Sequence, residues 1–171
     1  MIEPDLVVVP LGDGHDREGF CCGVESLDLY LRSQAGQDVR RRANGVFVLA
    51  EKAAPDCVLG YYTLCATALA PGEVPEEARK HIPRFPLVSA TLIGRLAVAR
   101  ARQGERLGSV LLADALRRAL ASAAAVGSSM IVVDAVDEGA AAFYAAYGFV
   151  RLPESLRLVL AMRTVERMEA G

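Results

Sequence analysis

A strand that runs into a two-glycine turn and then into a long helix is the feature that most constrains this fold. The stretch RLAVARARQGERLGSVLLADAL begins at Arg95, and residues 96–98 are apolar enough to form the strand. Residues 103–108 form the turn, and apolar residues recur at helical spacing from Ser109. The first N–H groups of a helix lack partners within it and, with the helix dipole, attract an anion. The turn therefore predicts an anion site or, alternatively, only a tight connection that needs glycine for its backbone angles.

The remaining pattern predicts an α/β fold with a twisted, mixed sheet of six or seven strands and helices on both faces. We expect two short helices within residues 24–42, divided near Gly36, and a proline-rich connection over residues 71–86 with one helical turn. The long helix should end near residue 126, and a further helix over residues 137–148 should close at Gly148. Strands are expected at residues 6–10, 46–52, 57–70, 89–98, 130–135 and 156–163.

Length and composition indicate a single globular domain that spans residues 1–171. The chain is 53% hydrophobic with a net charge of −2, which argues against wholesale wrapping of nucleic acid but allows a local basic patch. Four cysteines without a C-x-x-C pair, and only two histidines, argue against a metal site and indicate reduced core thiols. The N-terminus resembles neither a signal peptide nor a membrane span, so we expect a cytoplasmic protein.

The turn is neither a P-loop nor a dinucleotide fingerprint, because it lacks G-K-[ST] and G-x-G-x-x-G. It resembles the pyrophosphate turn of the GNAT superfamily of acyl-coenzyme A-dependent N-acetyltransferases, whose pattern is [RQ]-x-x-[GA]-x-[GA]. Gln103 and Gly108 match, while Arg106 stands where the family most often has glycine. A residue with φ below zero can still present its N–H there, and a guanidinium suits a pyrophosphate.

A second motif supports the resemblance further along the chain. The family pattern A-x-x-F-Y-x-x-x-G-F, on the helix beside the thioester, is met by Ala140, Phe143, Tyr144, Gly148 and Phe149. The resemblance implies a GNAT fold with acetyl-coenzyme A as co-substrate. The coenzyme-binding residues that it implies are Leu96, Ala97, Val98, Gln103, Gly104, Arg106, Leu107, Gly108, Ser109 and Phe143.

The chain is similar, more narrowly, to one branch of the superfamily, the acetyltransferase toxins of bacterial toxin–antitoxin pairs. The segments that carry this similarity are FCCGVESLDLYLRSQAGQDVRRR, GYYTL, IPRFPL and GRLAV, and it extends from about residue 20 to 158. The resemblance implies acetylation of the α-amino group of aminoacyl-tRNA, which blocks translation. It also implies a ribbon-helix-helix antitoxin and a homodimer. Two alternatives stay open: a housekeeping GNAT acting on a small amine or protein N-terminus, and a non-catalytic acyl-coenzyme A-binding module.

Acyl transfer to an amine needs an oxyanion donor, a fixed thioester, a neutral amine and a proton for the departing thiolate. A backbone N–H of the strand that ends at Val98, splayed from its neighbour, is the predicted oxyanion donor. Tyr144 is the predicted general acid, with Tyr147 as its rival on the same helix. No His or Glu stands in an obvious base position. Its absence favours an α-amine, whose pKa near 8 leaves it partly neutral, over a lysine amine near 10.4.

A run of arginines is the predicted surface for the RNA. Arg40, Arg41 and Arg42 form the run, and we assign Arg84 and Arg95 to the same substrate, with Arg32 nearby in sequence. The simpler interpretation of the run is a solvated helix face, and Arg95 has the further alternative of pairing with a carboxylate. The sequence does not identify the amino acid or tRNA chosen, the antitoxin or the oligomeric state.

Overall fold

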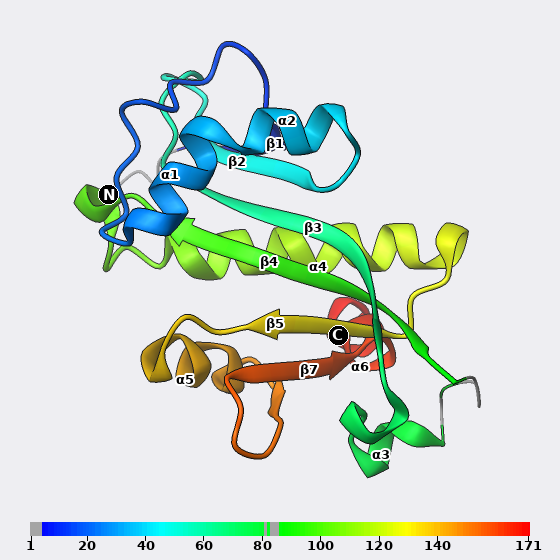
Figure 1. Ribbon diagram of the computed structural model, residues 1–171. Helices are drawn as coiled ribbons and strands as arrows, with labels where there is room; N and C mark the ends of the chain where they lie inside the picture. The colour runs from blue at the N-terminus through cyan, green and yellow to red at the C-terminus, as the bar shows by residue number, and fades with distance from the viewer. Residues whose placement is uncertain (1–4, 81, 83–85) are drawn as a thin grey trace. The chain divides into compact units, whose positions relative to one another are not determined.

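The computed structural model describes residues 5–80, 82 and 86–171 (Figure 1). In this part of the chain the strands follow the order β1-β2-β3-β4-β5-β7-β6 in a mixed sheet. The strands are β1 (Leu6–Pro10), β2 (Gly45–Glu51), β3 (Gly60–Leu69), β4 (Val88–Val98), β5 (Met130–Asp134), β6 (Val150–Arg151) and β7 (Arg157–Ala161). The helices are α1 (Glu25–Ser33), α2 (Ala35–Arg40), α3 (Glu76–Arg79), α4 (Leu107–Val126), α5 (Glu138–Ala146) and α6 (Met162–Ala170). The predicted α/β class and mixed sheet are confirmed.

The chain divides into two compact units. Unit 1 comprises Met1–Leu64 and Arg95–Ala115, and unit 2 comprises Cys65–Gly94 and Leu116–Gly171. Strands β3 and β4 each contribute residues to both units. Whether the whole chain behaves as one domain therefore stays a prediction.

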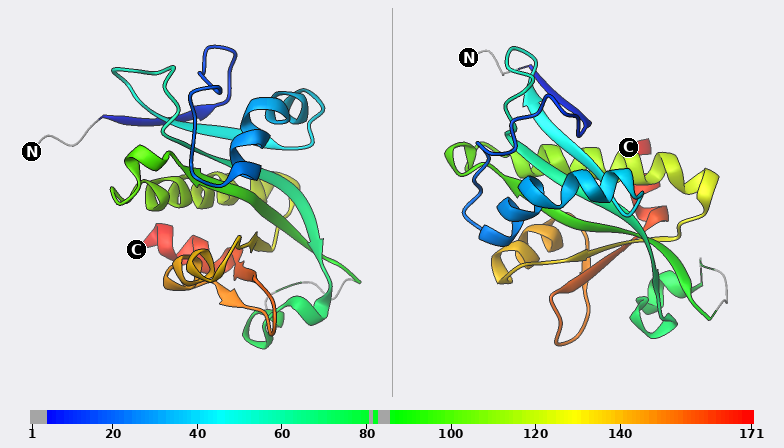
Figure 2. Two further views of the ribbon diagram at one scale, coloured as in Figure 1. Left: turned by 60° about the vertical axis from the view of Figure 1, so that its left-hand side comes forward. Right: turned by 45° about the horizontal axis from the view of Figure 1, so that its top comes forward.

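In unit 1, helices cover both faces of an antiparallel arrangement of β1, β2 and the start of β3. Side chains alternate between the faces of a strand, so Tyr61 and Tyr62 point to opposite sides. Tyr61 is buried with Val46, Val48 and α1 residues such as Leu31 in one core cluster. The Tyr62 hydroxyl, on the other face, donates a hydrogen bond to Asp114 of α4. The two views in Figure 2 show α1 and α2 beside β2.

In unit 2, β5 is a central strand whose first four residues are buried. It pairs in parallel with β4 over Ala90↔Met130 to Ile93↔Val133 and antiparallel with β7. Met130 and Val132 belong to a core cluster with Val159, while Ile131 and Val133 are equally buried on the opposite face. A short strand buried on both faces explains the unbroken apolar run MIVV.

Several local predictions needed correction. The two short helices are divided at Gln34 and not at Gly36, which lies within α2. The strand β3 begins at Gly60 and not at Cys57, because residues 52–57 form turns and an isolated bridge between Asp16 and Cys57. The predicted last strand ends at Ala161, and the chain continues as α6. Helix α6 buries Met162 and Val165, three residues apart, and exposes the charged positions between and after them. The two-residue strand β6 was not predicted.

Candidate active site

The turn after β4 leads into α4 through two residues in left-handed backbone conformation. Gly104 has φ +87° and Arg106 has φ +63°. Our expectation of a negative φ at Arg106 was wrong, because this arginine adopts the conformation that glycine adopts without strain. The first bond of α4 runs from the Val110 N–H to the Arg106 carbonyl, so the N–H groups of residues 107–109 precede the helical ladder. This arrangement can hold a pyrophosphate.

Side chains of the turn and of the residues just before it bond to neighbouring parts of unit 1 and fix the shape of the turn. The amide Nε2 of Gln103 donates to the Val98 carbonyl at 3.0 Å and to the Cys22 carbonyl at 2.8 Å. The Arg102 guanidinium is bonded to Glu51 through Nη1 at 2.7 Å and to Glu105 through Nε at 2.9 Å. Gln103 therefore positions the turn through its side chain. Its direct contact with a coenzyme stays a prediction.

The predicted coenzyme strand lies at the C-terminal end of β4. Its ladder with β5 ends at Ile93↔Val133 in the described residues, and β4 continues to Val98. Ala97 is buried in the core cluster beneath α1. Leu96 and Val98 alternate to the other face and are half-buried. Because the Ala97 side chain is committed to the core, only its backbone is available to a thioester.

Tyr144 lies on α5 in unit 2, held by aromatic neighbours. Asp137 caps this helix by accepting a hydrogen bond from the Ala140 N–H at 2.8 Å. The Tyr144 ring contacts Phe143 edge-on at 5.3 Å between centroids and Phe149 at 5.6 Å. Burial raises the pKa of Tyr144 to about 12. Its hydroxyl is therefore protonated throughout the physiological range, which suits a hydrogen-bond or proton donor.

The rival phenol is placed differently. Tyr147 follows the last residue of α5, is half-buried, and its ring centroid lies 5.3 Å from that of Phe143. Phe143 thus contacts both tyrosines, and its own predicted role at the coenzyme stays untested. A role for either hydroxyl needs a measurement.

The arginines assigned to RNA fall into two environments within unit 1. Arg40 ends α2, and Arg41 and Arg42 follow it, all three exposed. Arg95 is half-buried, with its guanidinium carbon 3.5 Å from the centroid of the Tyr30 ring. Arg95 forms no ion pair with a carboxylate among the described residues, so the structure does not support the alternative of such a pair. Arg84 lies outside the described residues.

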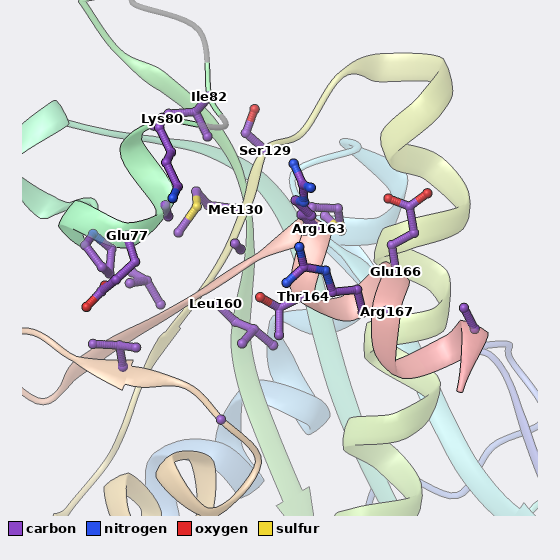
Figure 3. A pocket seen from close by; sticks show the side chains of 18 residues that line it. Glu77, Lys80, Ile82, Ser129, Met130, Leu160, Arg163, Thr164, Glu166 and Arg167 are labelled. Carbon is purple, nitrogen blue, oxygen red and sulfur yellow. The ribbon is translucent and has the colours of Figure 1, made fainter.

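A cavity of about 860 Å³ lies in unit 2, bordered by α3, α6 and the strands β5 and β7 (Figure 3). Arg163 and Arg167 project from α6 on one side, and Glu77 and Lys80 lie on the α3 side. None of the predicted site residues in the described chain is among those that line it. Gly148, which belongs to the A-x-x-F-Y-x-x-x-G-F motif, does line the cavity.

Metal-binding clusters and membrane spans are both absent from the part of the chain that the structure describes. It contains no group of three or more His, Cys, Asp and Glu side chains arranged to hold a metal ion. Among these residues there is also no helix of the length and hydropathy needed to cross a membrane.

The fold and motifs agree with comparisons to known proteins. Residues 21–149 match the acetyltransferase (GNAT) family, and the chain belongs to this family. It is therefore an acyltransferase, as the sequence predicted. A tRNA-acetylating toxin from Mycobacterium tuberculosis is 34% identical over 154 residues, covering 90% of each chain. A probable toxin TacT from Sinorhizobium fredii is 25% identical, covering 95% of this chain and 94% of the relative.

Solved structures of toxins resemble the fold closely. A Tyr-to-Phe mutant of KacT has a TM-score of 0.89 and 27% identity, covering 96% of this chain and 99% of KacT. AtaT complexed with acetyl-methionyl-tRNAfMet has a TM-score of 0.87 and 29% identity, with coverage of 96% and 99%. The AtaTR complex with acetyl-coenzyme A has a TM-score of 0.84 and 28% identity, with coverage of 96% and 98%.

Proposed function

We propose that this protein is an acetyl-coenzyme A-dependent toxin that acetylates the α-amino group of aminoacyl-tRNA. The observation that carries the proposal is the 34% identity, over 90% of both chains, to a relative named for tRNA acetylation. The similar structure of AtaT with acetyl-methionyl-tRNAfMet supports the same chemistry. The product can no longer offer a free amine, so translation is blocked.

The residues divide the chemistry between them. The N–H groups at the start of α4 bind the coenzyme pyrophosphate, and the end of β4 that extends beyond its ladder with β5 offers a backbone N–H to the thioester carbonyl. Tyr144 donates a proton or hydrogen bond to the departing thiolate. The α-amine attacks in its neutral form, since its ordinary pKa of about 8 makes a dedicated base unnecessary.

Incubation with labelled acetyl-coenzyme A and total aminoacyl-tRNA tests the proposal. We expect label on the α-amino group of the esterified amino acid and none on deacylated tRNA. Free lysine and a peptide N-terminus serve as competing acceptors. Label that appears only on these amines would favour the housekeeping alternative. Coenzyme binding without transfer to any acceptor would favour the non-catalytic module.

The coenzyme site has a separate test in Gly108, the second residue of α4. Gly108→Val places a branched side chain beside the N–H groups of the first turn, so coenzyme affinity should be lost while the fold survives. Gly72→Val is the matched control, because a Cβ at Gly72 meets nothing within 4 Å. Equal coenzyme affinity of Gly108→Val and the parent would remove the pyrophosphate assignment.

The partners belong to the same proposal. AtaT has been solved with the C-terminus of its antitoxin AtaR, and KacTA with DNA. We infer a small antitoxin of the ribbon-helix-helix type, a homodimeric toxin and a cytoplasmic site of action. A neighbouring reading frame for such a protein, whose co-expression relieves growth arrest, is the expected finding. Growth arrest that no neighbouring gene relieves would contradict the antitoxin inference.

The non-catalytic alternative rests on a single departure from the family pattern. It depended on arginine in place of glycine at position 106, and Arg106 adopts a glycine-like φ of +63°. The backbone of the turn is therefore formed despite the departure from the family pattern.

A further inference from the structure

Arg95 is an arginine whose side chain is directed back over the protein. It follows Gly94 in β4 and lies two residues before Ala97, so the two side chains share one face of the strand. Ala97 belongs to the cluster under α1, and Arg95 meets Tyr30 of α1, with 3.5 Å between its guanidinium carbon and the ring centroid. A planar guanidinium on an aromatic face keeps its in-plane N–H donors available at its edge.

The ring beneath Arg95 is locked in place. The Tyr30 hydroxyl donates to Oδ2 of Asp38 at 2.8 Å and accepts a bond from Nδ2 of Asn44 at 3.2 Å. Asn44 also donates to Asp38 Oδ2 at 3.0 Å. The Tyr61 ring stacks near Tyr30 with 6.3 Å between centroids and an interplanar angle of 17°. Burial and the bond to Asp38 raise the pKa of Tyr30 to about 12, so the hydroxyl remains a donor.

Arg95 is half-buried but forms no ion pair with a carboxylate in the part of the chain that the structure describes. The carboxylate of Asp38 is bonded to Tyr30, Asn44 and Gln34, and these bonds, with a weaker attraction from Arg95, hold its pKa below its usual range. A partly desolvated guanidinium with open donors is suited to a bidentate bond with a phosphate.

The faces of unit 1 indicate which phosphate. Helix α4, whose N-terminus is the proposed coenzyme site, packs on the Gly60 and Tyr62 face, where a Cβ at Gly60 would lie 2.8 Å from Leu111. Arg95 lies on the opposite face, under α1. The exposed arginines of α1, α2 and the residues after α2 belong to this same side of the unit: Arg32, Arg40, Arg41 and Arg42. An RNA phosphodiester is therefore a better ligand than the coenzyme pyrophosphate.

We propose that Tyr30, locked by Asp38 and Asn44, is a positioning residue that holds Arg95 as a ligand for a phosphodiester of the RNA substrate. This inference rests on the proposed function and assigns a part of the RNA site. Arg95 contacts the substrate, and Tyr30 acts through Arg95.

Steady-state kinetics of four variants test the proposal. Arg95→Ala should raise the KM for charged tRNA by about tenfold or more, with kcat and the KM for acetyl-coenzyme A unchanged. Arg95→Lys should not restore the KM, because an ammonium lacks the planar fork. Tyr30→Leu should match Arg95→Ala, and the double variant should be no worse than either. Tyr30→Phe keeps the ring but loses the hydroxyl that bonds to Asp38 and Asn44. Its KM for charged tRNA should therefore lie between those of the parent and Tyr30→Leu.

The control is Lys52→Ala, which removes an exposed cation of unit 1 and should leave all constants unchanged. Thermal unfolding of every variant distinguishes a protein that no longer folds from one that only binds RNA more weakly. An increase confined to the KM for acetyl-coenzyme A would assign the phosphate to the coenzyme and overturn the proposal. Unchanged constants, additive effects of the two substitutions, or full rescue by lysine would overturn it as well.

A direct measurement separates this inference from the proposed function. Filter binding of labelled uncharged tRNA reports RNA affinity without acetylation. A parent that binds RNA through Arg95 and Tyr30 but transfers no acetyl group would sustain the inference and refute the proposed activity. A parent that does not bind RNA would overturn the inference.

Discussion

At the scale of single residues, Arg106 shows how a departure from a family pattern is accommodated. Its φ of +63° lies in the left-handed region, which costs a side-chain-bearing residue about 1–2 kcal/mol. Arg106→Gly should leave the free energy of unfolding unchanged or raise it by up to about 1 kcal/mol, since relief of strain is partly offset by glycine's entropy. Arg106→Val should lower it, because a β-branched residue tolerates this region worst. Urea titrations check both, and a less stable Arg106→Gly would show that the arginine side chain supports the turn.

Whether Tyr144 or Tyr147 protonates the departing thiolate can also be tested with single substitutions. Tyr144→Phe keeps the packing against Phe143 and Phe149 and removes only the hydroxyl. We expect about 10²–10⁴-fold slower single-turnover acetylation with little change in substrate binding. Tyr147→Phe, measured beside it, should be near normal. The reverse result would give the role to Tyr147, and normal rates for both would mean that solvent protonates the thiolate.

The pH dependence of the rate follows from the pKa of Tyr144. Burial raises this pKa to about 12, so the donor stays protonated as the pH rises from about 6 to 9. The α-amine loses its proton over the same range, since its pKa is near 8. The single-turnover rate should therefore rise with pH and level off, without a decline. An enzyme-free control corrects for ester hydrolysis. A declining limb below pH 9 that disappears in Tyr144→Phe would show that the phenol is far more acidic than burial indicates.

At the scale of elements, Gly60 sets how closely α4 approaches β3. A Cβ there would lie 2.8 Å from both the backbone oxygen of Ala97 and Cδ1 of Leu111. Leucine can move, but the backbone oxygen belongs to a strand. Gly60→Ala should therefore destabilise the protein by about 1–3 kcal/mol, measured by denaturant unfolding. Gly72→Ala, which meets nothing within 4 Å, is the control. A fully stable Gly60→Ala would show that β4 shifts without cost.

The sequence predicted elements well where the signal is local. Hydrophobic spacing and the following glycine located the ends of α4 and α5, and the boundary of α4 at Val126 agrees. The start of α6 was missed because Ala161 precedes it without a side-chain cap, and the apolar strand β7 continues directly into Met162. The stacking of Arg95 on Tyr30 was not predictable, because it depends on packing between α1 and β4 and on no sequence motif.

At the scale of the whole molecule, the mixed character of the sheet was predictable, but its full pairing pattern and the assembly were not. The strand–helix–strand units of the second half predicted parallel pairing, and the hairpin-like first half predicted antiparallel pairing. The antiparallel pairs β1–β2 and β2–β3 and the parallel pair β4–β5 confirm this. The pair β5–β7 contradicts it, because β7 runs antiparallel to β5 with the short strand β6 antiparallel on its other side. We still propose a single domain, since β3 and β4 contribute to both compact units. A homodimer or an antitoxin interface depends on surfaces of another chain, which no pattern within this sequence encodes.

The net charge of the whole molecule affects how it binds RNA. The chain carries −2, so it repels RNA on average and depends on local cations for binding. Arg40, Arg41 and Arg42 are exposed and concentrate positive charge at one place on the surface. Their replacement by alanine should weaken binding of charged tRNA and reduce the slope of log affinity against log salt, by about 0.7–0.9 for each phosphate that is no longer neutralised. Coenzyme affinity should be kept.

A control with the same change in net charge decides whether position or total charge matters. Lys52, Lys80 and Arg167 are exposed and lie outside the arginine run, and their joint replacement by alanine should leave the salt slope near that of the parent. Equal losses of affinity in the two triple variants would mean that only total charge acts on the RNA. If the slope of log affinity against log salt is unchanged after replacement of the arginine run, the run is only a solvated helix end. Arg95 would then bind phosphate without help from the run.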